Sequence, residues 1–430
     1  MRVATITGGL CAATMLLTSI AAGAATLCVN PIGSGGCAAT IGAAVTAANP
    51  GDTITVAKGT YHEIVVIDKA LALIGANRKT TIIDAAGLSV VVNTNTIANG
   101  IFVDGIDNAG LSGVLISGFT IRNAKFEGIL IANATSVTAT DNIVTLNDGS
   151  LASPNCPGIP SFETNEGFDC GEAIHLLGAD HSIVSNNLVE KNAGGILISD
   201  DTAAAHDNLV EGNTVRNNPF DCGITLASHA PAAFTMASSP FGVTHNTITG
   251  NLSSANGLDI AGAGAGVGIF DSVPGTINSG NVVINNTLTK NGLPGVAMHG
   301  HAPGQFLNDN QIVDNVISKN GQDTKDAATP GPTGINVFSV TAATGTVIAG
   351  NVIKDEAFDV VVNTAAPANV DIHLNDLMGK GAGVANLGSS TATADAIDNF
   401  WGCAKGPGTP GCSTVSGAGV LTAPFAAKPF

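Results

Sequence analysis

The sequence predicts an all-β solenoid, in which the chain winds in successive coils and its short strands stack into parallel sheets. One unit recurs: a segment of the form N-x-x-x-x-N, with an apolar third place, precedes a Gly-led apolar run. These segments begin at Asn187, Asn213, Asn246, Asn286 and Asn315. The apolar runs are only about four or five residues long, too short for helical repeats. Gly and Asn reach left-handed backbone angles at least cost, and in-register stacking predicts ladders of asparagine side chains.

This repeat resembles the right-handed parallel β-helix of the pectate-lyase superfold over nearly all of the chain beyond residue 24. Residues 50–75 are similar to the opening coils of many secreted β-helix proteins, and Asp398-Asn-Phe-Trp-Gly402 is similar to the terminal motif of that family. The family includes sugar-binding and hydrolase-related proteins and the periplasmic copper-binding proteins of nitrous oxide reductase maturation. The resemblance implies a single-stranded right-handed parallel β-helix that binds carbohydrate or metal.

Residues 1–24 have the pattern of a secretory signal peptide: Arg2, an apolar run over 10–20, and the small residues Ala22-Gly23-Ala24 before a cleavage site. No other segment is apolar over about 18 residues, so no membrane span is predicted. We expect the protein to be secreted or periplasmic.

Residues 25–430 are expected to form one elongated domain, because the repeats continue without a linker. An N-terminal cap is predicted at about 25–49 and a C-terminal cap at about 396–430. The first cap includes a short helix over 38–48, where apolar residues fall at helical spacing and Asn49-Pro50 provides the stop. This helix is expected to cover the open end of the first coil.

Seven cysteines remain after the signal peptide, and six of them form local pairs in the sequence. In an exported chain, this spacing predicts the disulfides Cys28–Cys37, Cys156–Cys170 and Cys403–Cys412. Cys222 is left over. We interpret it as a buried free thiol.

The chain is acidic, with 16 basic against 33 acidic residues and a net charge of −17. Such a surface repels polyanions, so nucleic acid is excluded as a partner. A long insertion between Asn147 and Cys170 adds acidic residues, among them Glu163. Glu172 follows shortly after Cys170. Carboxylates of this kind bind Ca²⁺, but their spacing matches no calcium loop, and a solvated acidic loop is the simpler interpretation.

Candidate functional residues follow the Gly-led runs. When the runs are aligned on Ile196, Ile224, Val267, Val296 and Ile335, polar residues recur three to five places later. Alternation of side chains puts the third and fifth places on the outer face of the coil. The catalytic candidates are Asp200, Asp201, His229, Asp271 and His301, and the ligand-binding candidates are Ser199, Phe270, Ser272 and His299. His175 and His206 lie outside this alignment and are expected at the surface.

Four interpretations of this column remain open. The side chains simply face solvent, or they form a polysaccharide-processing cleft, in which His and Asp supply acid and base. Two imidazoles and a carboxylate also suit Zn²⁺ or Cu²⁺, and the fourth interpretation is a carbohydrate-binding face without chemistry. A hydrolase would use Asp200, Asp201 and Asp271, with His229 and His301 orienting them. A lyase would use a neutral His as base, with a cation such as Ca²⁺ against the uronate charge; the cofactor is otherwise open.

Family motifs do not select one activity. Asp200-Asp201 and Ser228-His229 are similar to two of the polygalacturonase motifs, but the Arg-x-Lys pair of that branch is absent. Fold alone does not imply a reaction. We therefore expect a monomer that binds a polysaccharide on its outer face, with hydrolysis, elimination or epimerisation left open. The alternatives are a structural or adhesive solenoid at the cell surface and a periplasmic metal-binding protein.

Overall fold

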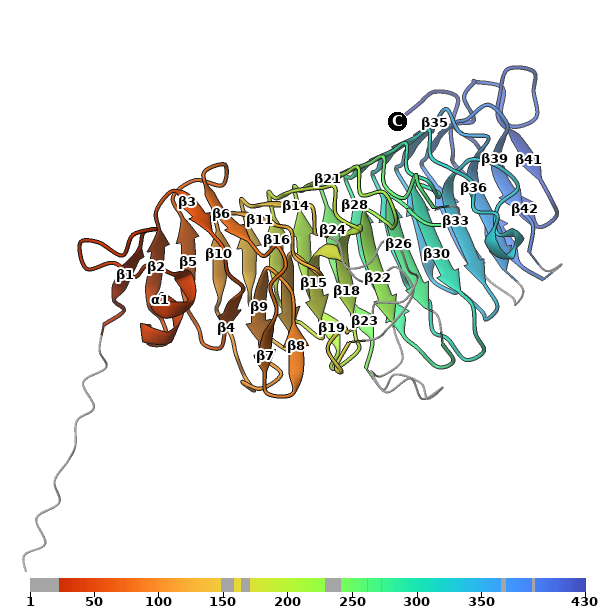
Figure 1. Cartoon of the computed structure of the whole chain (residues 1–430). Helices are drawn as coiled ribbons and strands as arrows, with labels where there is room; N and C mark the ends of the chain where they lie inside the picture. Colours follow the sequence, from red (N-terminus) through yellow and green to blue (C-terminus); the bar gives the residue numbers. More distant parts are fainter. Residues whose placement is uncertain are drawn as a thin grey trace, which may run out of the picture.

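The computed structural model describes residues 23–147, 158–163, 171–228, 241–260, 262–271, 273–364, 369–388 and 391–430. Within these ranges the chain winds into a long stack of coils, with the N-terminal strands at one end and the C-terminal strands at the other (Figure 1). Most of the expected signal peptide, both cysteines of the expected Cys156–Cys170 bridge, and the site candidates His229 and Ser272 lie outside the described residues.

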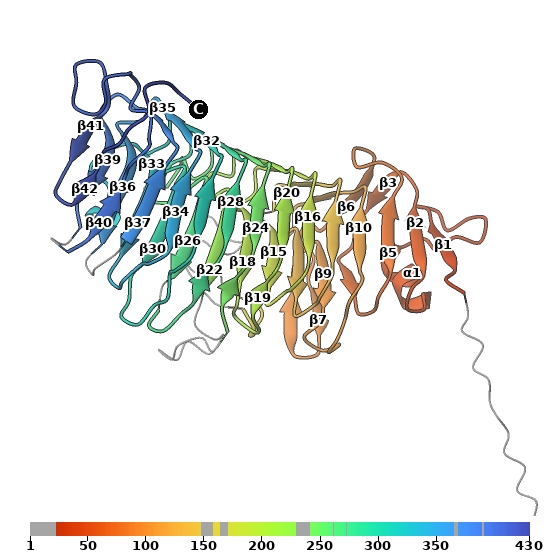
Figure 2. The same cartoon turned by 180° about the vertical axis from the view of Figure 1, so that it is seen from behind.

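Three long sheets form the sides of the coils, and every strand pair within them is parallel. Sheet A, which extends along the whole stack in Figure 2, contains β1 (Thr26–Val29), β2 (Thr53–Val56), β5 (Ala72–Gly75), β10 (Leu115–Ser117), β13 (Thr138–Thr140), β16 (Ile183–Ser185), β20 (Leu209–Glu211), β24 (Thr247–Thr249), β28 (Val282–Ile284), β31 (Gln311–Val313), β34 (Thr346–Ala349), β37 (Asn369–His373), β40 (Thr393–Asp395) and β42 (Val420–Leu421). Sheet B contains β3 (Gly59–Tyr61), β6 (Thr81–Asp84), β11 (Thr120–Arg122), β14 (Ile143–Thr145), β17 (Leu188–Glu190), β21 (Thr214–Arg216), β25 (Leu252–Ser254), β29 (Thr287–Thr289), β32 (Val316–Ser318), β35 (Val352–Lys354) and β38 (Asp376–Met378).

Sheet C holds the Gly-led runs and positions the candidate site. Its strands are β4 (Val65–Ile67), β9 (Ile101–Asp104), β12 (Ile129–Ala132), β15 (Glu172–Leu177), β18 (Gly194–Ser199), β22 (Ile224–Ser228), β26 (Val267–Asp271), β30 (Val296–Gly300), β33 (Thr333–Ser339), β36 (Phe358–Thr364), β39 (Ala382–Asn386) and β41 (Thr414–Ser416). Smaller elements are the hairpin β7 (Val90–Val92) and β8 (Asn95–Ile97), the strands β19 (Ala205–His206), β23 (Val243–Thr244) and β27 (Asn278–Ser279), and the 3₁₀ turn η1 (Lys325–Ala327).

The predicted inward ladder is confirmed. Ile196 pairs with Ile224, Ile224 with Val267, and Val267 with Val296 on consecutive strands of sheet C. All of these side chains are buried in one continuous core that runs through the stack. Parallel strands covered on the inside need an apolar residue at each inward place, so the sequence pattern sets this register.

Asparagine ladders hold the coils together at the corners, as the sequence predicts. The longest ladder contains nine asparagines, from Asn142 to Asn399. Asn142 Nδ2 donates to Asn187 Oδ1 at 3.2 Å, and the same contact recurs between successive members. The residue before each ladder asparagine has a left-handed backbone, for example Asn186 with φ 55°. Because these amides are buried, their pairing along the axis satisfies polar groups that the turn would otherwise leave unpaired.

The two ends of the stack are capped. At the first coil, α1 (Ile41–Ala47) confirms the predicted helix, and Glu63 accepts the backbone N–H groups of Ile41 and Gly42 at its N-terminus. Near the last coils, Trp401 is fully buried, with its ring against the backbone of Gly383. No helix in the described ranges is long and apolar enough to span a bilayer.

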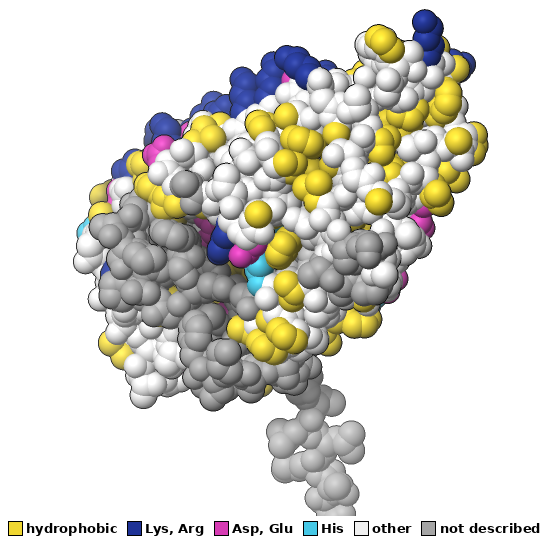
Figure 3. Space-filling model, turned by 90° about the vertical axis from the view of Figure 1, so that its right-hand side faces the viewer, with side chains coloured by type: hydrophobic (Ala, Val, Ile, Leu, Met, Phe, Trp, Pro, Cys, Tyr) yellow, Lys and Arg dark blue, Asp and Glu magenta, His cyan; other side chains and the backbone are white. Residues whose placement is uncertain are grey.

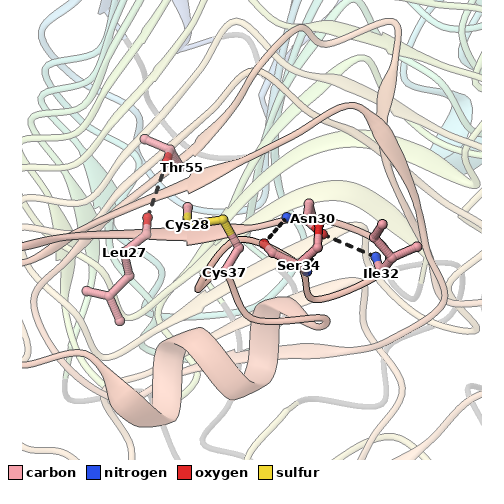
Figure 4. Close-up of a disulfide and its surroundings, with 7 residues drawn as sticks. All are labelled: Leu27, Cys28, Asn30, Ile32, Ser34, Cys37 and Thr55. Atoms are coloured by element: carbon pink, nitrogen blue, oxygen red, sulfur yellow. Dashed lines mark hydrogen bonds between the residues drawn. A yellow bond between two sulfur atoms is a disulfide. The ribbon is translucent and has the colours of Figure 1, made fainter.

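Two predicted disulfides are present, Cys28–Cys37 beside the first coil (Figure 4) and Cys403–Cys412 near the last. Cys222 is a buried free thiol, as expected, and burial raises its pKa well above the usual value. Disulfides of this kind are typical of an extracellular or periplasmic protein.

The outer face of sheet C differs from the sequence prediction, because much of it is buried. Outward side chains such as Leu197, Ala297 and Asn336 have almost no exposed surface. Segments between sheets B and C lie across this face: Phe162 stacks on Phe102 with ring centroids 5.9 Å apart, and Asp323 contacts the outward side chain of His299. Polar side chains on the outer face of sheet C therefore lie in a buried interface. There, hydrogen bonds and charge interactions are stronger than in open solvent, and an unpaired polar group costs more free energy.

Candidate functional site

Two predicted site residues, Phe270 of β26 and His299 of β30, belong to one cluster on the outer face of sheet C. Phe270, His299 and Phe338 pair in register on three consecutive strands, β26, β30 and β33. His301 follows β30 and is anchored by its backbone N–H, which donates to Asp271 O at 3.2 Å. The histidine cluster is defined by these side chains and three from neighbouring segments: Phe270, His299, His301, Asp323, Asp326, Asn336 and Phe338.

His299 lies at the centre of the histidine cluster. Its Nε2 is 3.1 Å from Asp323 Oδ2 and 2.9 Å from Asn336 Nδ2, and its Nδ1 is 3.3 Å from His301 Nε2. Phe270 meets the His299 ring edge-on, with centroids 5.4 Å apart. His299 and Asp323 are both buried, so bulk water does not screen the contact between them.

His301 is the imidazole of the cluster that solvent reaches. Its side chain is 28% exposed, and its Nε2 lies 3.1 Å from Oδ2 of Asp326, which is itself 43% exposed. Partial burial, followed by the charge of His299, lowers the pKa of His301, while the Asp326 carboxylate opposes that shift. His301 is therefore neutral at neutral pH, the form in which an imidazole accepts a proton.

The surroundings of the cluster are partly apolar. Phe338 lies against both imidazoles, with centroid distances of 5.4 Å to His299 and 5.6 Å to His301. Figure 3 shows a patch of histidine beside acidic and basic side chains near the middle of one face, bordered by hydrophobic side chains. The same view shows Lys and Arg gathered along a separate edge of the molecule.

Asp201 and His301, which the alignment of the Gly-led runs puts at the same place in the coil, do not come together. Asp201 follows β18 and His301 follows β30, three strands further along sheet C, which corresponds to about 14 Å. Asp201 is buried beside a different group, made up of Glu127, Glu163, Glu172 and His175. A shared place in each coil fixes the direction of these side chains but not the distance between them along the axis.

Asp200 and Asp271 are also buried, and neither presents its carboxylate at the surface. Asp200 Oδ2 accepts a hydrogen bond from Ser228 Oγ at 3.0 Å. Asp271 pairs in register with Ser228 and Gly300, so alternation turns it toward the inside of the coil. Ser199 is buried as well and contacts His175, with 2.8 Å between Oγ and Nε2.

Several side chains of these clusters were not singled out from the sequence. Asp323 and Asp326 lie in the segment between β32 and β33, and the length of this segment before a Gly-led strand is the sequence signal of an insertion in the repeat. His175 was expected at the surface and is buried, because its outward place on β15 lies under a covered part of sheet C. Of these side chains, only those in the insertion had a signal in the sequence that pointed to a functional position. Nothing in the local pattern of β15 distinguishes a covered outer face from an exposed one.

A second His/Asp group lies on the surface beside β19. Ligand atoms of Asp180, His181 and His206 are all within 4.8 Å of one another. His206 Nδ1 lies 2.8 Å from Asp207 Oδ2, and the two imidazole rings meet edge-on with centroids 5.5 Å apart. The side chain of His206 is one-third exposed, so for this residue the predicted surface position is confirmed.

Comparisons with known proteins identify the architecture. Residues 89–272 match a family model described as right handed beta helix region. The chain is similar in structure to DFA-IIIase from Arthrobacter chlorophenolicus A6 in complex with GF2, with a TM-score of 0.55 and 14% sequence identity, over 90% of this chain and 92% of that chain. No curated protein matches the chain in sequence.

Two longer structures are similar over part of their length. One is the Agl-KA catalytic domain, with a TM-score of 0.49, 14% identity, and coverage of 90% of this chain and 64% of that chain. The other is the catalytic unit of a thermostable GH87 alpha-1,3-glucanase from Streptomyces thermodiastaticus strain HF3-3, with a TM-score of 0.46, 16% identity, and coverage of 89% and 65%. This chain thus spans just under two thirds of each. The matching family model and the three parallel sheets identify the chain as a right-handed parallel β-helix.

Proposed function

We propose that the protein binds a polysaccharide over the accessible part of the outer face of sheet C, at Phe270, His301 and Phe338, and modifies it there, with His301 as the general base. The observation that carries this proposal is the chain of contacts from Asp323 through His299 to His301. A buried carboxylate orients one imidazole, which in turn contacts a second imidazole that solvent reaches. Such an arrangement holds a base in place and stabilises the positive charge it acquires.

Proton abstraction fits the cluster better than glycoside hydrolysis. Hydrolysis uses two carboxyl groups on either side of the bond that is cleaved. Within the described part of the cluster, Asp323 is buried and occupied by His299, which leaves Asp326 as the solvent-accessible carboxylate. A single neutral imidazole with an accessible edge suits removal of a carbon-bound proton beside a sugar carboxylate, as in elimination or epimerisation.

A polymer is the substrate class that suits the site. Strands in sheet C repeat about every 4.8 Å, so an extended chain laid along the axis meets equivalent positions on successive coils. Phe270 and Phe338 flank His299 along this axis, and both keep part of their surface exposed. Their apolar rings offer a platform for the apolar faces of sugar rings, next to the imidazole edge of His301.

The proposal includes export. Residues 1–24 would direct the chain out of the cytoplasm, where the disulfides Cys28–Cys37 and Cys403–Cys412 form and where polysaccharide is available. In this proposal the mature chain acts as a monomer.

The test is an activity screen against uronate-containing and neutral polysaccharides, with GF2 and DFA-III as additional small probes. Ultraviolet absorbance detects unsaturated products, and solvent deuterium incorporation detects epimerisation. His301→Ala is expected to reduce turnover at least 100-fold, the usual contribution of a general base. The matched control is His206→Ala, which removes an exposed histidine from another surface. If the wild type turns over one of these polysaccharides and His301→Ala retains that turnover, the active site lies elsewhere.

A further inference from the structure

A second group of ligand-type side chains lies under the outer face of sheet C, away from the histidine cluster. Glu127 stands two residues before β12, His175 lies in β15 on the next coil, and Glu163 comes from the segment between β14 and β15. Their exposed fractions are 0%, 3% and 4%. One ligand atom from each lies within 4.8 Å of the others, although Glu163 is distant in sequence from Glu127.

The polar atoms that face one another in this group lack hydrogen-bond partners. Among the described residues, no hydrogen bond reaches Glu127 Oε1, Glu163 Oε1 or His175 Nδ1. A buried polar atom without a hydrogen-bond partner lowers the stability of the fold by about 1–3 kcal/mol. Three such atoms close together therefore indicate that a bound ligand pairs with them. His175 Nδ1 and Glu127 Oε1 are 3.6 Å apart, too far for a hydrogen bond. That separation is close to the ~3.4 Å between two ligands at about 2.1 Å from a tetrahedral ion.

The opposite edges of the same side chains are held by neighbours. His175 Nε2 lies 2.8 Å from Ser199 Oγ, and when this nitrogen carries the proton, Nδ1 keeps a free lone pair. Asn99 donates a short hydrogen bond from Nδ2 to Glu127 Oε2, which turns Oε1 toward the other two residues. Support of this kind, in which the far side of each ligand is fixed, is typical of metal sites in proteins.

The surrounding charge also favours a cation. Glu172 and Asp201 are buried beside the group, so four carboxyl groups and one imidazole share a region removed from water. Like charges at this density need protons or a bound cation to remain buried.

We propose that Glu127, Glu163 and His175 bind one divalent transition-metal ion of the Zn²⁺ type. The imidazole nitrogen distinguishes this donor set from a Ca²⁺ site, which is built from six to eight oxygen ligands. Three protein ligands leave a fourth position for water or for a neighbouring carboxylate such as Glu172. The ion would join Glu163 to β12 and β15, and so fasten residues 158–163 onto sheet C.

The test measures zinc binding to the full chain after chelator treatment, by metal analysis and by calorimetric titration with Zn²⁺ alone. The wild type is expected to bind one buried equivalent and to unfold at a higher temperature with zinc than without it. Glu127→Gln and His175→Gln should each lose that equivalent and the thermal shift. Ser199→Ala, which removes the positioning contact to His175, should weaken zinc binding 10- to 100-fold.

His206→Gln is the matched control, because His206 belongs to the exposed Asp180–His181–His206 group. It should leave the buried equivalent and the thermal shift unchanged. Circular dichroism of each metal-free variant checks its fold, and three independent substitutions keep the proposal testable if one variant does not fold. The proposal fails if the wild type binds no zinc, or if Glu127→Gln and His175→Gln both bind it as the wild type does. It also fails if only His206→Gln loses zinc, or if Ca²⁺ binds in its place and His175→Gln has no effect.

Discussion

Asn320 donates both its backbone N–H and its side-chain Nδ2–H to the carboxylate of Glu356, at 2.9 and 3.0 Å. Glu356 thus occupies the place that an asparagine holds on the preceding coils, from Asn147 to Asn320. The ladder ends in an ionisable group that is 1% exposed. Burial raises the pKa of Glu356 to about 7, and the two hydrogen bonds from Asn320 only partly offset that shift.

This contact makes stability pH-dependent near neutrality. The pKa of Glu356 is higher in the folded chain than in the unfolded one, so between about pH 4.5 and 7 the folded state binds more protons. The free energy of unfolding is therefore expected to fall as pH rises through this window, by up to about 3 kcal/mol. Glu356→Gln, which keeps the acceptor oxygen and removes the charge, should flatten that slope in urea unfolding. Glu190→Gln, at a partly exposed position where the carboxylate pairs with Arg216, should leave it intact; equal slopes in all three proteins would contradict the assignment.

The acid limb of activity should follow His301. A general base works only in its neutral form, and burial lowers the pKa of His301, so kcat/KM should stay constant at neutral pH and fall in acid. Asp326→Asn removes the carboxylate that raises this pKa, so the acid limb should move to lower pH. Asp355→Asn, which removes a partly exposed carboxylate that pairs with Lys319 and Lys380, is the matched control. An acid limb that Asp326→Asn leaves in place would argue against His301 as the titrating base.

Asp323 is expected to act by positioning. Its Oδ2 lies 3.1 Å from His299 Nε2 and it does not touch the solvent-accessible edge of His301. Asp323→Asn should lower kcat more than it raises KM, because orientation of the base matters most in the transition state. Steady-state kinetics on the substrate found in the screen measures this division. A variant with lower stability but unchanged kcat would limit Asp323 to a structural role.

The asparagine ladder should be costly to interrupt. Asn251 Oδ1 accepts from the backbone N–H and Nδ2 of Asn213, and Asn251 Nδ2 donates to Val210 O and Asn286 Oδ1. Asn251→Leu keeps the side-chain volume but leaves these buried partners unpaired, and should destabilise the fold by about 3 kcal/mol or more. Urea unfolding of Asn369→Leu, a surface position, gives the comparison and is expected to change by less than about 0.5 kcal/mol.

The cysteines provide a chemical check of the coil geometry. Peptide mapping without reduction should recover the Cys28–Cys37 and Cys403–Cys412 bridges, and we predict a third bridge between Cys156 and Cys170. Cys222 is buried and its thiol pKa is raised, so a thiol reagent should label it only after unfolding. Any bridge to Cys222, or its rapid labelling in the native protein, would contradict this arrangement.

The sequence by itself determined the solenoid, its inward ladder and its asparagine corners. Each of these depends on a local rule repeated at every coil: an apolar residue at each inward place, and a left-handed residue before each ladder asparagine. The same alignment placed Phe270 and His299 correctly beside each other on neighbouring strands. A repeat determines which residues are neighbours on successive coils, so these features could be predicted from the order of residues along the chain.

Only the tertiary structure decided what covers sheet C. The segment carrying Asp323 and Asp326 returns over His299 and His301, and the segment carrying Glu163 returns over Glu127 and His175. Neither segment follows the repeat, so no periodic signal predicts where its side chains come to rest. Their contacts turn an outer face that the pattern made solvent-exposed into buried polar clusters. There, low dielectric and close like charges set the pKa values of His301 and Glu163.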